Sequence, residues 1–233
     1  MIKIRPAEKR GLTNIGWLKS YHTFSFGDYY DPDNMGFRSL RVINEDRVKG
    51  GEGFDVHPHN NMEIISIVLA GALQHKDSMG NGSVIKRGDV QLMSAGTGVT
   101  HSEYNASKTE ESHFLQIWII PAQKGLKPGY QQKYFSEEQK ANKLCLFVSS
   151  EGEAGSLLIH QDMKLFGVHL TAPNNIQYPL AVNRHVWLQM IKGNLLCNKQ
   201  VLKQGDGASV SEEKALNFTT PTSAELLLFD LNY

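Results

Sequence analysis

Apolar residues in this chain come in short runs, and this spacing limits the possible folds more than any other feature. The runs are IISIVLA (64–70), VQLM (90–93), FLQIWII (114–120), LCLFV (144–148), VWLQMI (186–191) and ELLLFDL (225–231). Turn residues separate them, as in DSMGNGS, KRGD, SAGTG and KQGDG. This pattern is typical of strands in a β-sandwich or barrel. We therefore predict an all-β protein, with one short helix in SEEQKAN (136–142), which opens with a serine and two glutamates.

A weak internal repeat suggests two similar barrels. VLAGALQHKDS followed by IKRGDVQLMSAG is similar to QMIKGNLLCNK followed by VLKQGDGASVSE. Each copy predicts a strand, a glycine, a second strand, a Gly-Asp pair and a third strand. A chain of 233 residues is long enough for one large β domain or two small ones.

Charge and cysteine content limit the binding partners and the cellular compartment that we expect. Lysine plus arginine equal aspartate plus glutamate at 24 each, without a block of like charge, so we expect neither nucleic acid nor a membrane as a partner. Cys145 and Cys197 form no CxxC motif, and the first ten residues are charged rather than apolar. These features predict a cytoplasmic protein without disulfides.

Two segments each place a pair of potential metal ligands two residues apart. FDVHPHNNME contains His57 and His59, and GTGVTHSEYN contains His101 and Glu103. On a strand, residues at i and i+2 point to the same face, so each pair can contact one ion. Pro58 cannot donate to a β-ladder, which favours an edge or bulged strand. The two pairs are candidates to converge from adjacent strands.

Three neutral imidazoles and one carboxylate suit iron, nickel, copper, cobalt, manganese or zinc, and suit calcium or magnesium poorly. Four protein ligands leave two octahedral positions open, as in catalytic rather than structural sites. Glu63 has the same face parity as His57 and His59, so strand geometry leaves Glu63 and Glu103 both open as the carboxylate. A chain with nine histidines can show HxH by chance, but the second pair favours a metal site.

These motifs resemble those of the cupin superfamily. GEGFDVHPH, beginning at Gly51, fits the first cupin motif, and the stretch from Gly88 through Gly96 to His101 resembles the second. Two departures, Ser94 in place of proline and a longer interval before the histidine, resemble the pirin branch. WLKSYHTFSF, YYDPDNMGF and LRVINED also resemble bacterial pirin-like proteins of the quercetin 2,3-dioxygenase type. The resemblance covers nearly the whole chain.

The resemblance implies a bicupin, with two antiparallel, jelly-roll-like β-barrels and little helix. The implied domains are 1–134, which holds the metal, and 135–233, which lacks the metal motif. Carried over by position, the pirin ligands fall on residues that are all present here: His57, His59, His101 and Glu103. We expect one divalent transition metal ion, iron first, with nickel, copper, cobalt, manganese or zinc as alternatives.

Enzymes of this family cleave flavonols such as quercetin with dioxygen, opening the heterocycle and releasing carbon monoxide. The resemblance implies the same activity here, on a flavonol-like substrate, with Glu103 as ligand and general base and Glu63 as the alternative. Pirins also include regulatory proteins that bind other proteins and whose metal is structural or redox-sensing. That function stays open, as does another cupin reaction on a different metabolite. We expect a monomer.

Apolar side chains near the motifs could form pocket walls, although aromatic residues in a β protein usually belong to the core. The candidates are Phe24, Phe26, Phe54, Met93, Phe114 and Trp118. We interpret His22 and His113 as hydrogen-bonded, partly buried side chains rather than ligands. The predicted site includes none of these residues.

Overall fold

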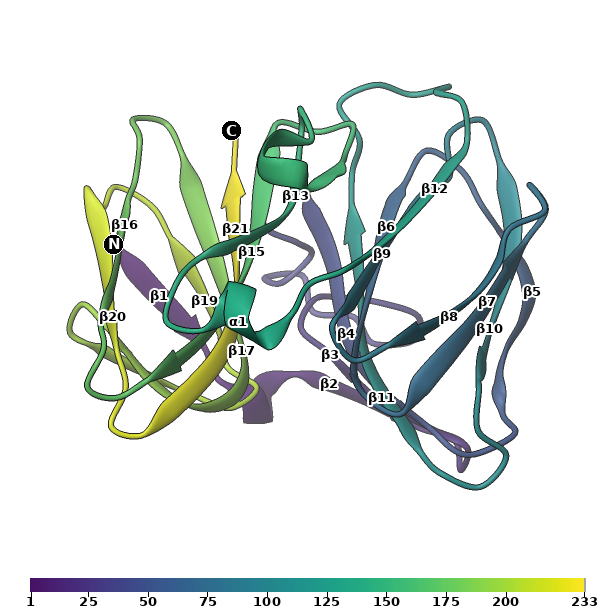
Figure 1. Ribbon diagram of the computed structural model, residues 1–233, viewed down its shortest axis with the longest axis horizontal. Helices are drawn as coiled ribbons and strands as arrows, with labels where there is room; N and C mark the ends of the chain where they lie inside the picture. Colours follow the sequence, from purple (N-terminus) through teal and green to yellow (C-terminus); the bar gives the residue numbers. More distant parts are fainter. Residues whose placement is uncertain (233) are drawn as a thin grey trace. The chain divides into compact units, whose positions relative to one another are not determined.

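The computed structural model describes residues 1–232, and antiparallel strands dominate it, which confirms the all-β prediction (Figure 1). The chain divides into two compact units. The first unit comprises Gly11–Tyr134 and Ile159–Gln161, and the second comprises Met1–Arg10, Phe135–Leu158 and the residues from Asp162 onward. Within residues 1–232, no helix is both long and apolar enough to span a membrane.

The first unit is built from strands β2 to β12. Their bounds are β2 Gly11–Asn14, β3 Leu18–His22, β4 Leu40–Val48, β5 Gly53–His59, β6 Glu63–Ala70, β7 Ala72–Asp77, β8 Gly82–Lys86, β9 Asp89–Ser94, β10 Val99–Asn105, β11 Ser112–Ile119 and β12 Gly129–Tyr134. One sheet has the order β12-β9-β6-β11-β4-β3-β2, and the other has the order β5-β10-β7-β8. Both sheets contribute to one apolar core, with Val68 and Phe114 from the first and Leu73 and Ile85 from the second.

The second unit contains the remaining elements. Their bounds are β1 Ile2–Arg5, a 3-10 turn Ala7–Lys9, α1 Glu137–Lys140, β13 Cys145–Ser149, a 3-10 turn Glu153–Gly155, β14 Leu157–Leu158, β15 Met163–Thr171, β16 Ile176–Pro179, β17 His185–Cys197, β18 Gln200–Lys203, β19 Gly207–Val210, β20 Ala215–Thr219 and β21 Ser223–Leu231. The main path of its sheet runs β1-β19-β17-β21-β15-β13-β14. The short helix begins where the sequence predicts, because the Ser136 side chain accepts the Gln139 N–H in a capping box.

The first ten residues belong to the second unit, whereas the predicted boundary at 134 had placed them in the N-terminal domain. Strand β1 pairs with β19 along its whole length. Ile2 and Ile4 alternate with exposed Lys3, so both point to one face and pack against the apolar core of the second unit. Burial of these two side chains is the physical reason for the difference.

The glycines of the sequence repeat occupy comparable backbone positions in the two units. Gly71 and Gly193 have φ values of 71° and 77°. A Cβ at these positions would lie 2.8 Å from the Glu111 carbonyl oxygen and 2.0 Å from the Ser223 carbonyl oxygen. Only glycine fits both the left-handed backbone and this close approach.

A row of polar residues crosses the larger sheet of the first unit at one register. His22 pairs with Asn44, Asn44 with Gln116, Gln116 with Ser66, and Ser66 with Gln91. Directly paired residues on neighbouring strands point to the same face, and all five side chains are buried. We call these five residues the polar row.

Candidate metal centre

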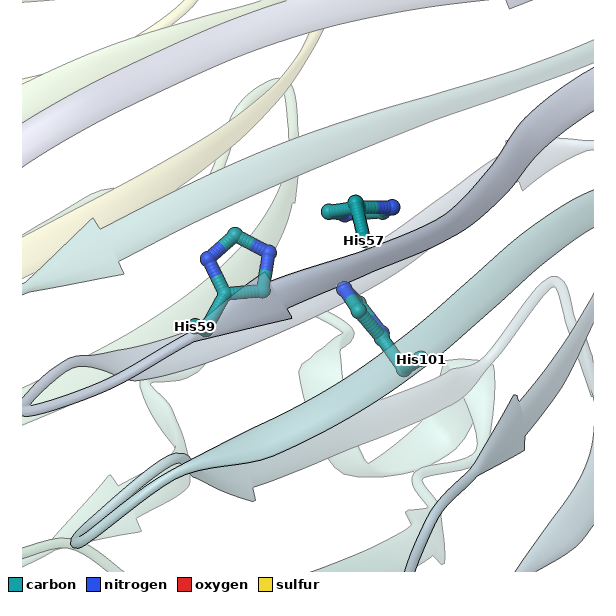
Figure 2. Close-up of side chains that lie close together, drawn as sticks. All are labelled: His57, His59 and His101. Atoms are coloured by element: carbon teal, nitrogen blue, oxygen red, sulfur yellow. The ribbon is translucent and has the colours of Figure 1, made fainter.

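Three histidines from two adjacent strands converge in the first unit. Strand β5 supplies His57 and His59, and β10 supplies His101, which lies directly opposite His57. The ring centroids are 4.5 Å apart for His57 and His101, 4.8 Å for His57 and His59, and 4.9 Å for His59 and His101. One nitrogen of each ring lies within 4.8 Å of the others (Figure 2). The structure thus brings three of the four predicted ligands together.

The protonation of these rings suits metal binding. Burial, with a further contribution from His57, lowers the pKa of His59 to about 4 and that of His101 to about 2. Both rings are therefore neutral at pH 7. His57 donates its Nδ1 proton to the Asp55 carbonyl oxygen over 2.7 Å, which leaves Nε2 as the ligand atom. Among residues 1–232, the buried Nε2 of His101 has no hydrogen-bond partner.

Glu103 lies on β10 two residues beyond His101, on the same side of the strand. A register shift in the β5–β10 pairing places Glu103 opposite Phe54. The carboxylate accepts hydrogen bonds from Gln116 over 2.6 Å and from Ser66 over 3.3 Å. Burial raises the pKa of Glu103 to about 7 against the opposing effect of the Ser66 hydrogen bond. Its oxygen lies within 4.8 Å of nitrogens of His75 and His101.

Glu63 lies elsewhere in the first unit. Its carboxylate accepts a hydrogen bond from Ser94 over 2.8 Å and lies 3.4 Å from the His160 Nδ1. It is not brought together with the three histidines, because β5 ends at His59 and β6 begins at Glu63 in the other sheet. Face parity holds only along one strand, and the chain changes strand between these positions.

A cavity of about 210 Å³ opens beside the histidines, and His57, His59 and Glu103 line it. Three of the apolar candidates, Phe26, Phe54 and Trp118, also line this cavity. The other three candidates, Phe24, Met93 and Phe114, are buried in the core.

The two remaining histidine candidates make hydrogen bonds. His22 lies 2.7 Å from the Asn44 Oδ1 and 2.9 Å from the Thr13 hydroxyl, and it also lines the cavity. His113 lies 2.9 Å from the Glu45 carboxylate. Neither belongs to a group of converging ligand atoms among residues 1–232.

Asp46 lines the cavity, and the sequence reasoning missed it. Burial raises its pKa to about 7, and its Oδ1 has no hydrogen-bond partner among residues 1–232. A signal was present, because Asn44 and Asp46 alternate in phase with Val42 and Val48, which places two polar residues on an apolar strand face. His75, which adjoins His101, was also missed, although His75 and Asp77 stand two residues apart and alternate in phase with Leu73.

The donor atoms fit a divalent transition metal ion, since three imidazoles and a buried carboxyl group are ligands that such ions prefer. Two units of antiparallel strands in one chain, the first with a histidine cluster on adjacent strands, are the arrangement of a bicupin. Residues 4–119 match the family described as Pirin, and residues 146–231 match the Quercetinase C-terminal cupin domain. The chain belongs to the pirin family.

Similar proteins align with nearly the full length of the chain. Over 231 residues, 46% are identical to a quercetin 2,3-dioxygenase of Escherichia coli K12, covering 99% of each chain. The structure resembles that of the bacterial pirin YhhW from Escherichia coli in complex with nickel(II), with a TM-score of 0.95, 44% identity, and 100% and 99% coverage. It also resembles the Escherichia coli protein YhaK, with a TM-score of 0.77, 30% identity, and 92% and 94% coverage.

Proposed function

We propose that this chain is a metal-dependent dioxygenase that opens the heterocycle of flavonols such as quercetin with dioxygen and releases carbon monoxide. The observation that carries the proposal is a buried carboxyl group, Glu103, in the same cavity wall as His57 and His59. The quercetin 2,3-dioxygenase of Escherichia coli, 46% identical, supports the choice of substrate class.

His57, His59 and His101 would hold the ion, with Glu103 as the fourth ligand; Glu63, which contacts Ser94 and His160 instead, is not proposed as a ligand. We expect iron first, and the nickel(II) complex of the Escherichia coli pirin favours a first-row ion of this kind. When bound, such an ion supplies Lewis-acid chemistry that lowers the pKa of a substrate hydroxyl.

Glu103 would receive the proton of the flavonol 3-hydroxyl. A general base works best when its pKa is near the working pH, and burial raises the pKa of Glu103 to about 7. The donors Gln116 and Ser66 fix the direction of the carboxylate. A glutamate that is both ligand and base must bind the ion loosely.

The cavity walls suit a flat aromatic ring. Trp118 makes edge-to-face contacts with Phe26 at 5.3 Å and with His59 at 4.9 Å between ring centroids. A planar substrate against these rings would bury apolar surface and exclude water from the carboxyl group. The polar side chains of Asn44 and Asp46 lie in the same wall and could bind ring hydroxyls.

The test is turnover by metal-loaded protein. Loss of flavonol absorbance in air and release of carbon monoxide are followed together, with His101→Ala as the control. We expect both signals in the wild type and neither in the control. Equal activity in the two proteins would refute the metal-dependent enzyme. Absence of turnover with iron, nickel, manganese and copper would instead favour a regulatory, partner-binding pirin or another substrate.

A further inference from the structure

A second group of buried side chains lies behind the metal centre, on the side of His101 away from its free Nε2. Strand β7 places His75 opposite Glu103 and Asp77 opposite His101. The Nδ1 atoms of His75 and His101 are 3.4 Å apart. The Nε2 of His75 lies 3.1 Å from the Asp77 Oδ2. Both side chains of the His75–Asp77 pair are fully buried.

The hydrogen bonds assign the proton on each ring. The Gln91 side-chain amide nitrogen lies 3.3 Å from the His75 Nδ1, and an amide nitrogen only donates. The Asp77 carboxylate only accepts, so the His75 Nε2 carries the proton of the neutral ring and donates it to Asp77, and the Nδ1 of His75 is an acceptor. Because the His75 Nδ1 accepts, the facing Nδ1 of His101 must carry a proton. The Nε2 of His101 is then a bare lone pair.

Asp77 is itself held in place by the turn between β7 and β8. Its Oδ1 accepts the backbone N–H groups of Met79 over 2.9 Å and Asn81 over 3.0 Å. Its Oδ2 accepts from the Asn81 side chain over 2.9 Å and faces His75. Local turn geometry thus fixes the carboxylate that orients the buried imidazole.

We propose that Asp77 and His75 are positioning residues that hold His101 in the tautomer with its proton on Nδ1, so that Nε2 is free to bind the metal ion. The chain of hydrogen bonds has two links. His75 Nε2–H donates to the Asp77 carboxylate, and His101 Nδ1–H donates to the His75 Nδ1, which leaves the His101 Nε2 for the metal ion. This inference rests on the proposed metal site but not on the dioxygenase reaction. Partners that fix a ligand histidine in this way typically change metal affinity by about 10- to 100-fold.

Asp77→Asn is the main test. The asparagine oxygen can still accept the turn N–H groups, but its amide would face the Nε2–H of His75, donor against donor. His75 should then move its proton to Nδ1, and His101 should move its own proton to Nε2, which blocks the ligand atom. We expect the dissociation constant for nickel(II) to rise about 10- to 100-fold. Nitrogen-15 NMR of metal-free protein should show the tautomer of His101 reversed.

Two further variants control for damage to the fold. Asp89→Asn removes a carboxylate that likewise accepts a turn N–H, from Lys86, and it should leave nickel(II) affinity unchanged. His75→Asn keeps an acceptor oxygen near the Nδ1 position and should bind nickel(II) more tightly than His75→Leu.

The NMR readout needs neither metal nor turnover, so failure of the dioxygenase proposal leaves it intact. Wild-type nickel(II) affinity in folded Asp77→Asn, or an unchanged His101 tautomer, would overturn the inference. If Asp77→Asn does not fold, equal nickel(II) affinity in His75→Asn and His75→Leu would overturn it.

Discussion

Two buried carboxyl groups face one cavity beside the metal centre. Burial raises the pKa of both Asp46 and Glu103 to about 7, and the charge of Asp46 contributes to the raised value of Glu103. Two negative charges in one buried cavity repel, so ionisation of one opposes ionisation of the other. Both raised pKa values lie near neutral pH, the range in which a general base works best.

Asp46→Asn should change stability in a pH-dependent way. The folded-state pKa of Asp46 is about 7 and its ordinary value is 3.8, so the folded state holds this proton more tightly. Stability from this group is therefore present at low pH and is lost as pH rises through 7. We expect metal-free Asp46→Asn to gain free energy of unfolding relative to wild type between pH 5 and pH 8.5. Urea unfolding at both values checks this, and a difference independent of pH would contradict it.

The two candidate carboxylates can be separated by single substitutions. Glu103→Gln removes the proposed base from the cavity and should lower kcat of metal-loaded protein by about 10²- to 10⁴-fold. Glu63→Gln alters a group that contacts Ser94 and His160 instead, and it should retain most activity. Bound metal is measured in each sample. Full turnover in metal-loaded Glu103→Gln would show that the Glu103 carboxylate is not the base.

The side chains that hydrogen-bond to Glu103 and His75 come from several neighbouring strands rather than from one segment. The polar row supplies Gln116 and Ser66 to Glu103 and Gln91 to His75, all from one register of one sheet. Because the side-chain period of a strand is two, a slip of β11 by one residue would replace Gln116 with an apolar side chain. Strand register therefore decides whether both the carboxylate and the histidine keep their partners.

Strand β1 offers a prediction about the second unit. Ile4→Ala removes apolar contact with the core of that unit and should destabilise it by about 1–3 kcal/mol. Lys3→Ala, the exposed neighbour on the same strand, is the matched control. Hydrogen–deuterium exchange should quicken in β19 for Ile4→Ala and stay unchanged in β5. Equal exchange in β19 for both variants would show that the pairing of β1 with β19 does not depend on the packing of Ile4 against the core.

The elements follow from sequence more readily than the site does. All six apolar runs coincide with strands, apart from Ile120 and Leu144 at the ends of two runs, and the i, i+2 spacing put His57 and His59 on one face. The same spacing misled for Glu63, because the turn after β5 moves it into another sheet. The IKIR segment predicts a strand but not which sheet edge it joins. The contact between His75 and His101 runs diagonally across two strands, so it depends on a register that spacing alone does not give.

Across the whole chain, the two units differ in their histidines. In the second unit, His169 lies 3.5 Å from the Glu137 carboxylate, and His185 lies 2.8 Å from the Ser211 hydroxyl. No group of converging ligand atoms occurs in the described residues of that unit. That the C-terminal domain binds no metal ion stays a prediction.

We expect one metal ion per chain. Elemental analysis of reconstituted protein should give one equivalent in the wild type and in His169→Ala, and little in His101→Ala. Added nickel(II) should raise the Tm of the first two proteins, because a ligand at about 100 times its Kd stabilises by about 2.7 kcal/mol. Two equivalents in the wild type, or the same rise of Tm in His101→Ala, would contradict a single site at this cluster.

The exchange of segments between the two units has a consequence for synthesis on the ribosome. β1 is among the first residues made, yet its partner β19 begins only at Gly207. The first unit likewise lacks Ile159–Gln161, and with it His160 beside Glu63, until the chain is well past residue 134. Neither unit can finish folding as it emerges, and closing contacts so distant in sequence is slow. The nascent chain must therefore keep the N-terminal strand, with Ile2 and Ile4, unpaired through most of its translation.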